Sequence, residues 1–180
     1  MAIEVELKAR VADYRALQER LERLSGGSPA LPVDKDDWYL GNDRLFRLRR
    51  EGGRVVFTTK ERSTHEGIET NTEHEFEAAA DQFDNALAFF TALGIPVVAR
   101  KTKRGVAYRL ECYEGLAPLT IELCEVSDLG WFVELEFVLS DEALIESAKR
   151  ALREALADLG IDDSQIESRP YLQLLSQRIG

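Results

Sequence analysis

The feature of this sequence that most restricts its fold is a regular alternation of charged and apolar residues. Near the N-terminus, Glu4, Glu6 and Lys8 occupy every second position, and aliphatic residues lie between them. Successive side chains of a β-strand point to opposite faces, so such a segment has one charged and one apolar face. Helical spacing would mix the two kinds of side chain. The alternation therefore predicts strands.

Several further segments have the same period of two, and short connections separate most of them. The expected strands are Ile3–Val11, Leu45–Arg50, Arg54–Lys60, Thr72–Glu77, Val97–Lys103, Val106–Tyr113, Leu119–Val126 and Trp131–Leu139. Glu51-Gly52-Gly53 and Arg104-Gly105 are predicted to be tight turns between neighbouring strands. Short connections favour antiparallel pairing, because parallel strands need a long crossover.

Three segments have the apolar spacing of amphipathic helices instead. They are expected at about Asp13–Leu24, at about Asp81–Leu93, and from an N-cap at Ser140 to about Leu159. A short helix is expected after Pro170. The fold class is therefore predicted to be α+β with a dominant sheet, and the length of 180 residues predicts a single domain over residues 1–180.

Composition excludes several classes of protein. The chain has 23 basic and 33 acidic residues, which gives a net charge of −10 and disfavours nucleic-acid binding. No apolar run approaches the length that spans a bilayer, and the first residues lack the pattern of a signal peptide. The cysteines, Cys112 and Cys124, form no zinc-binding spacing. We therefore expect a reduced cytoplasmic protein that binds neither nucleic acid nor membrane.

The charged faces of the expected strands allow two arrangements. An open antiparallel sheet would expose its charged face to water and cover its apolar face with helices. A sheet curled into a barrel would point the charges inward. The charged faces carry Glu, Lys and Arg almost exclusively, with carboxylates on the first, fifth and last strands and bases on the middle ones. This sorting favours a binding site, but the pattern alone leaves both arrangements open.

The barrel arrangement implies a particular kind of ligand. An eight-stranded barrel has space for one small molecule. Unpaired charges in a dry interior would each cost several kcal/mol, so the interior would have to be hydrated. A polyanion with divalent cations would satisfy both sets of side chains, because bases bind the anion and carboxylates hold the cations. Polyphosphate with Mg²⁺ or Mn²⁺ is the ligand that this reasoning predicts.

A series of short motifs follows in order along the chain: Glu4-x-Glu6-x-Lys8, Arg47-x-Arg49, Thr58-x-Lys60, Glu73-x-Glu75, Lys101-x-Lys103, the segment Leu129–Glu136 and the terminal segment Ser168–Leu175. Together these motifs resemble those of the CYTH superfamily, the triphosphate tunnel metalloenzymes. The resemblance implies a closed eight-stranded antiparallel β-barrel, or tunnel, with flanking α-helices. It also implies chemistry on a triphosphate-containing small molecule with Mg²⁺ or Mn²⁺, and it is compatible with a homodimer.

The resemblance also assigns roles to individual residues. The phosphate oxygens would be bound by Lys8, Arg47, Arg49, Lys60, Lys101 and Lys103. The metals would be held by Glu4, Glu6, Glu75, Glu134 and Glu136. Glu6 and Lys8 are the expected catalytic residues. One departure matters: Cys124 stands where the family usually has an aspartate, and a thiol is a poor ligand for Mg²⁺. Glu122, two residues earlier and on the same face, is the expected replacement ligand.

The resemblance covers two reactions and leaves a third role open. In class IV adenylate cyclases the ribose 3′-hydroxyl attacks the α-phosphorus of ATP, and pyrophosphate leaves. In the triphosphatases water attacks the terminal phosphorus of inorganic triphosphate, thiamine triphosphate or another triphosphate. The chain length and the strand that contains Trp131 resemble the cyclase group more. The third alternative is a non-catalytic protein that binds polyphosphate or a nucleotide.

Overall fold

Eight strands form the body of the protein in a computed structural model, which describes residues 3–111 and 113–177. Cys112 lies outside the described residues. The strands are β1 (Ile3–Arg10), β2 (Leu31–Gly41), β3 (Leu45–Glu51), β4 (Arg54–His65), β5 (Ile68–Ala79), β6 (Val97–Leu110), β7 (Leu119–Val126) and β8 (Gly130–Leu139).

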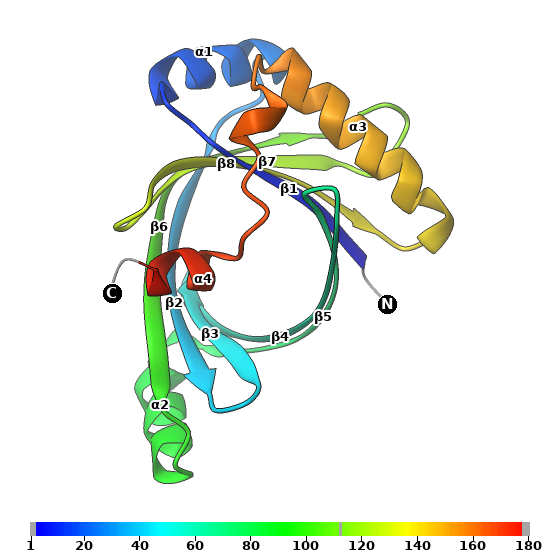
Figure 1. Ribbon diagram of the computed structural model, residues 1–180. Helices are drawn as coiled ribbons and strands as arrows, with labels where there is room; N and C mark the ends of the chain where they lie inside the picture. Colours follow the sequence, from blue (N-terminus) through cyan, green and yellow to red (C-terminus); the bar gives the residue numbers. More distant parts are fainter. Residues whose placement is uncertain (1–2, 112, 178–180) are drawn as a thin grey trace.

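The strands close into one barrel in the order β1-β5-β4-β3-β2-β6-β7-β8 (Figure 1), and all neighbouring pairs are antiparallel. Strand β1 joins the two ends of this order: Glu6 lies opposite Glu69 of β5 on one side and opposite Glu136 of β8 on the other. The prediction of a closed antiparallel barrel is confirmed, and the open sheet is excluded.

Strand β2 was absent from the expected strands. Its segment contains Pro32 and an acidic run, Asp36 and Asp37 among them, and such residues are depleted in strands. The strand nevertheless alternates, because Trp38 and Leu40 contribute to the apolar cluster under a helix while Lys35 lines the interior of the barrel. Tertiary packing on both faces compensates for the low strand propensity of this segment.

The segment predicted as two strands with a turn at Arg104-Gly105 is the single strand β6, so that prediction was wrong. Gly105 lies inside the strand, opposite Cys124 of β7. A β-carbon at Gly105 would clash with the backbone of Leu123 and Cys124, which explains the glycine by close approach instead of by a turn. Strand β2 was not predicted, and strand β6 was predicted as two strands. These two errors offset each other, so the predicted number of strands is correct.

In the described part of the chain, four α-helices lie outside the barrel or at its end: α1 (Tyr14–Leu24), α2 (Phe83–Ala92), α3 (Ile145–Asp158) and α4 (Tyr171–Ser176). The first begins as predicted, because the Asp13 carboxylate accepts hydrogen bonds from the backbone N–H groups of Arg15 and Ala16. The third begins later than predicted, after a 3₁₀ turn capped by Asp141 instead of Ser140. Among the described residues, no helix is long and apolar enough to cross a membrane.

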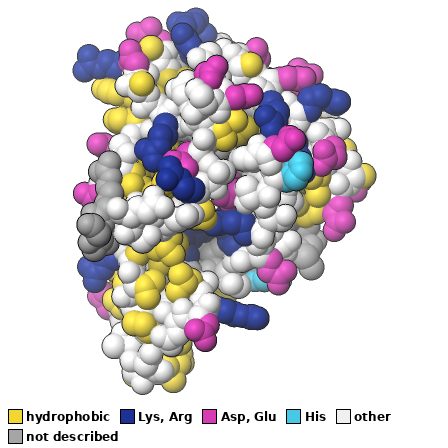
Figure 2. Space-filling view, viewed as in Figure 1, with side chains coloured by type: hydrophobic (Ala, Val, Ile, Leu, Met, Phe, Trp, Pro, Cys, Tyr) yellow, Lys and Arg dark blue, Asp and Glu magenta, His cyan; other side chains and the backbone are white. Residues whose placement is uncertain are grey.

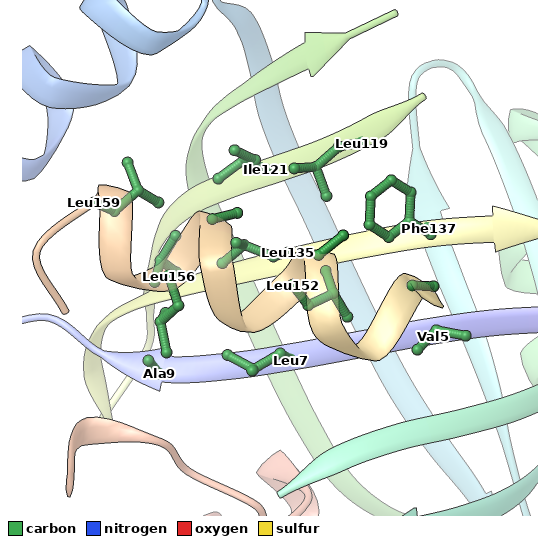
Figure 3. Packing of buried hydrophobic residues seen from close by; sticks show 14 of the residues in the cluster. Val5, Leu7, Ala9, Leu119, Ile121, Leu135, Phe137, Leu152, Leu156 and Leu159 are labelled. Carbon is green, nitrogen blue, oxygen red and sulfur yellow. The ribbon is translucent and has the colours of Figure 1, made fainter. Parts of the chain in front are cut away.

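The main hydrophobic core lies between the outer face of the barrel and helices α1 and α3. Figure 3 shows Leu152 and Leu156 of α3 between Leu135 of β8 and Leu7 of β1. These four side chains are almost fully buried. Because the apolar faces of the strands pack outward against the helices, their charged faces point into the barrel. Burial of apolar area thus positions the charged interior.

Helix α4 packs at one end of the barrel (Figure 1, red). Its buried side chains Tyr171, Leu174 and Leu175 form a separate apolar cluster. They pack with residues from β7, β8 and the turn between them, and the ring of Phe132 meets Tyr171 edge-on. The predicted docking of the C-terminal helix on the barrel is confirmed, and the helix contributes residues to the interior.

Candidate functional site

The barrel encloses a charged cavity of about 900 Å³. Figure 2 shows basic side chains in a hollow at the centre of this face of the molecule. All of the side chains that the sequence selected line the cavity: Glu4, Glu6, Lys8, Arg47, Arg49, Lys60, Glu75, Lys101, Lys103, Glu122, Glu134 and Glu136. The structure therefore brings the whole predicted set together around one space.

Three of these carboxylates form an acidic cluster, which consists of Glu4, Glu6 and Glu136. Oxygen atoms of the three side chains lie within 4.8 Å of one another. Glu6 and Glu136 lie directly opposite on β1 and β8, where like charges destabilise a sheet. Burial, together with the charges of Glu4 and Glu6, raises the pKa of Glu136 to about 8.

The acidic cluster has the chemistry of a site for a hard divalent cation. Burial also raises the pKa of Glu6, and the neighbouring charge of Glu134 adds to this effect. A bound cation would reverse both shifts, because positive charge stabilises the carboxylates. Closely spaced carboxylate oxygens are the ligands that Mg²⁺ and Mn²⁺ prefer. The residues present therefore fit the metal that the sequence predicted.

Glu122 and Glu134 are instead paired with lysines. The ammonium nitrogen of Lys103 lies 2.6 Å from Glu122 and also contacts Glu134, and Lys35 lies 2.7 Å from Glu122. Burial by itself would raise the pKa of Glu122, but Lys103 and Lys35 lower it to about 2. These two carboxylates are therefore ionised, and the lysines balance their charge. In this respect they differ from the carboxylates of the acidic cluster.

Glu75 and Lys60 lie on the part of the wall formed by β4 and β5. The Glu75 carboxylate accepts a hydrogen bond of 2.5 Å from the Thr58 hydroxyl and lies 3.4 Å from Arg47. Lys60 donates to Glu4 at 2.9 Å and also contacts Glu73. Lys60 thus reaches from the wall to the acidic cluster, whereas Glu75 is held by Arg47 and Thr58.

The unexpected strand β2 supplies two charged residues that sequence reasoning missed, Lys35 and Asp37. The fully buried carboxylate of Asp37 lies 2.6 Å from Arg49 and 2.9 Å from Lys101. Although burial opposes ionisation, Lys101 and Arg49 hold the pKa of Asp37 well below its usual range. The alternation of Lys35, Asp37 and Tyr39 was the signal that could have revealed both residues.

Other cavity residues were also missing from the predicted site. Glu73 shares the inward face of β5 with Glu75, so the alternation could have identified it. Arg62 and Glu69 form an ion pair of 2.9 Å on the part of the β4–β5 hairpin beyond the expected strands. They were overlooked because both strands are longer than the sequence indicated.

Tyr171 of α4 is a further site residue that the strand pattern could not reveal. The ammonium nitrogens of Lys8 and Lys101 lie 4.4 and 4.6 Å from the centre of its ring. Lys8 also donates a hydrogen bond of 2.8 Å to the backbone carbonyl of Arg169. The C-terminal segment therefore contacts two of the predicted phosphate-binding lysines.

Cys124 is fully buried and does not line the cavity. Burial raises the pKa of its thiol to about 12. Metal ligation by cysteine requires the thiolate, and a thiolate is in any case too soft for Mg²⁺. The structure therefore supports the expectation that Cys124 does not replace the aspartate as a ligand.

Comparisons with known proteins agree with this geometry. The family model described as CYTH domain matches residues 2–171. A Methanocaldococcus jannaschii protein named "Putative adenylate cyclase" is 27% identical over an alignment of 178 positions, which covers 96% of this chain and 98% of that protein. Adenylate cyclase CyaB of Aeromonas hydrophila is 26% identical over an alignment of 182 positions, which covers 98% of this chain and 90% of that protein.

A solved structure shares the fold over nearly the whole chain. The PH1012 protein of Pyrococcus horikoshii superposes with a TM-score of 0.79 at 27% identity, and the match covers 95% of this chain and 98% of that one. The fold as a whole thus resembles that of a solved structure.

Proposed function

The chain belongs to the CYTH domain family, and we propose that it is a Mg²⁺- or Mn²⁺-dependent enzyme that acts on a triphosphate inside its tunnel. The reaction proposed is that of a class IV adenylate cyclase, in which ATP gives cyclic AMP and pyrophosphate. The adenylate cyclase names of the two relatives support this choice of reaction. We also propose that residues 1–180 form a single tunnel domain.

The observation that carries the proposal is the separation of charge within one cavity. The acidic cluster lies on β1 and β8, whereas Arg47, Arg49 and Lys101 lie on β3 and β6. Sites with this separation bind a chelated polyanion, because the bases contact phosphate oxygens while the carboxylates hold the cation. An ordinary structural network would pair every carboxylate with a base. Within residues 3–111 and 113–177, the three carboxylates of the acidic cluster form an ion pair with a single base, Lys60, through Glu4.

The acidic cluster is the proposed metal site. When bound there, the cation would neutralise charge on the phosphates and orient them. Glu122, Glu134 and Glu75 are proposed to join the metal-binding set once the triphosphate draws their basic partners away. Lys103 is the clearest case, because one ammonium group now neutralises both Glu122 and Glu134.

The chain's own residues supply positioning and charge. Arg47 and Arg49 suit bidentate contacts with phosphate oxygens, whereas the lysines, Lys8, Lys60, Lys101 and Lys103, supply compact charges. For the cyclase reaction we assign Lys8 to neutralise the charge that develops on the leaving pyrophosphate. We assign Glu6 to accept the proton of the ribose 3′-hydroxyl, because its carboxylate lines the cavity in which the substrate would lie.

A product assay tests the proposal. The protein is incubated with Mg²⁺ or Mn²⁺ and, separately, with ATP, inorganic triphosphate and thiamine triphosphate. Cyclic AMP and pyrophosphate from ATP are the expected products. Glu136→Gln should abolish turnover, whereas Glu111→Gln, a change on the exposed outer surface, should leave it unchanged. Two results would contradict the proposal: turnover by the wild-type protein in the presence of a chelator, and turnover by Glu136→Gln.

Hydrolysis of a triphosphate is the second candidate function. The charged residues of the cavity suit phosphate groups and cations, which every triphosphate substrate brings. This observation favours a hydrolase that accepts triphosphates without a nucleoside. Orthophosphate release without cyclic AMP would establish this reaction in place of the cyclase. Thermal stabilisation by the ligand without turnover would establish a binding protein instead.

A further inference from the structure

An asparagine in the barrel wall has a buried amide oxygen without a partner. Asn71 of β5 is 1% exposed, and its Oδ1 accepts no hydrogen bond from residues 3–111 and 113–177. An unsatisfied buried polar atom costs about 1–3 kcal/mol. Such an atom in a folded protein requires an explanation, and a ligand that it contacts is one.

The strand register places Asn71 beside the acidic cluster. Asn71 lies directly opposite Glu4 of β1 and opposite Arg62 of β4, and both of these residues line the cavity. Residues opposite one another in an antiparallel pair have β-carbons about 4.5–5.5 Å apart on the same face. The side chain of Asn71 therefore points into the barrel next to Glu4.

The side-chain amide of Asn71 is oriented so that its nitrogen has a hydrogen-bond partner, whereas its oxygen has none among the described residues. Asn71 Nδ2 donates to Glu69 Oε2 at 3.4 Å, and Glu69 in turn pairs with Arg62. Because the carboxylate can only accept, it selects the amide nitrogen and turns the oxygen away from itself. A carboxylate-rich site thus has a neutral oxygen donor at its edge.

We propose that Asn71 Oδ1 is a ligand of the divalent cation held by Glu4, Glu6 and Glu136. This inference rests on the proposed function, since it concerns the same metal. Amide oxygens are ordinary ligands of hard cations. A neutral oxygen increases the number of ligands without adding to the repulsion among the three carboxylates.

The proposal also predicts which strands of the barrel carry the metal ligands. The substitution at Cys124 removes a potential carboxylate from β7, where Glu122 is paired with Lys35 and Lys103. Asn71 adds an oxygen on the opposite side of β1, on β5. The ligands thus centre on β5, β1 and β8, and we expect one tightly bound cation per chain.

This assignment is tested by measuring the binding of Mn²⁺ in the absence of a triphosphate. Electron paramagnetic resonance detects the Mn²⁺ that remains free. The variants are Asn71→Leu, which removes the oxygen, and Asn71→Asp, which keeps an oxygen but loses the donor to Glu69. Asn85→Leu, an exposed asparagine on α2, is the matched control. We expect Asn71→Leu to weaken Mn²⁺ binding by about tenfold or more, while Asn71→Asp and Asn85→Leu bind at least as tightly as wild type.

Thermal unfolding of the metal-free proteins adds a second readout. Asn71→Leu should unfold at about the same temperature as wild type, because removal of the unsatisfied amide oxygen offsets loss of the long hydrogen bond to Glu69, which keeps its ion pair with Arg62. Its stabilisation by Mn²⁺ should be smaller. If Asn71→Leu does not fold, the Asn71→Asp variant decides, because loss of Mn²⁺ binding in a folded Asn71→Asp protein would show that the residue serves only to hold Glu69.

Two other results would overturn the assignment in distinguishable ways. Wild-type affinity for Mn²⁺ in a folded Asn71→Leu protein would refute the role of Asn71 and leave the proposed function intact. A wild-type protein that takes up no Mn²⁺ would refute the metal site as a whole, and the proposed function with it.

Discussion

The ammonium nitrogen of Lys8 lies 4.4 Å from the centre of the Tyr171 ring, although the two residues come from opposite ends of the chain. Lys101 contacts the same ring at 4.6 Å. One aromatic side chain therefore contacts two ammonium groups for which we propose a role in phosphate binding. A contact of this kind stabilises by about 0.5–2 kcal/mol.

Replacement of Tyr171 should separate the effect of the ring from that of the hydroxyl. Tyr171→Phe keeps the ring and should bind inorganic tripolyphosphate as wild type does. Tyr171→Leu keeps much of the apolar volume but loses the attraction for the lysines, so its affinity should fall by about 2- to 30-fold. Isothermal titration calorimetry measures both, and equal affinities of two folded variants would contradict the role of the ring.

Removal of the buried charge of Asp37 should strongly destabilise the fold. Asp37→Asn leaves the guanidinium of Arg49 and the ammonium of Lys101 without their shared counter-ion. Breaking a buried ion pair from one side costs about 3–5 kcal/mol. Urea unfolding measures the loss. The control is Asp36→Asn, which breaks a more exposed pair with Arg104 and should cost at most about 1 kcal/mol. Comparable losses in the two variants would contradict the prediction.

Metal binding at the acidic cluster should release a proton. With a pKa of about 8, Glu136 is largely protonated at pH 7 in the metal-free protein. A cation requires the carboxylate, so Mn²⁺ should displace up to about one proton at pH 7 and far fewer at pH 9. Calorimetry in buffers of different ionisation enthalpy counts the protons. Proton release that does not change between pH 7 and pH 9 would argue against this shift.

The same shift predicts how the stability of the metal-free protein depends on pH. The pKa of Glu136 rises from an ordinary 4.5 to about 8 on folding, so the folded state binds this proton more tightly than the unfolded state does. The contribution to stability is therefore complete below about pH 4.5 and is lost as the pH rises towards 8. Glu136→Gln should flatten this decline in urea unfolding experiments between pH 5 and 8. An unchanged slope would refute the assignment to Glu136.

The thiol of Cys124 should be unreactive in the folded protein. Its pKa of about 12 leaves almost no thiolate at pH 8, and the side chain is fully buried. In a Cys112→Ser background, labelling by a disulfide reagent should be slow in buffer and rapid in denaturant. Rapid labelling of the folded protein would show that the thiol is accessible, contrary to the structure.

Residues that share one strand were predictable from the sequence. Glu4, Glu6 and Lys8 had to share a face, because alternation is a property of the extended backbone and requires no knowledge of neighbouring strands. The turn at Gly52-Gly53 was predictable for a similar reason, since both glycines adopt the positive φ that a tight hairpin needs. Local geometry was sufficient for these features.

Features that depend on competing local signals were harder to predict. Strand β2 carries an acidic run and a proline, so its local propensity argued against a strand although its pattern was compatible with one. At Gly105 a glycine that permits close approach of β7 resembled a turn glycine. In both cases the deciding contacts come from strands that are distant in the sequence.

By itself the sequence determined most of the alternating strands, their antiparallel character and which charged side chains of one strand share a face. Only the tertiary structure decided which of these side chains meet. Closure of the barrel sets Glu136 opposite Glu6, pairs Glu122 and Glu134 with Lys103, and brings Tyr171 to Lys8. The physical reason is that alternation follows from backbone geometry within one strand, whereas partners across strands follow from the register and packing of the whole barrel.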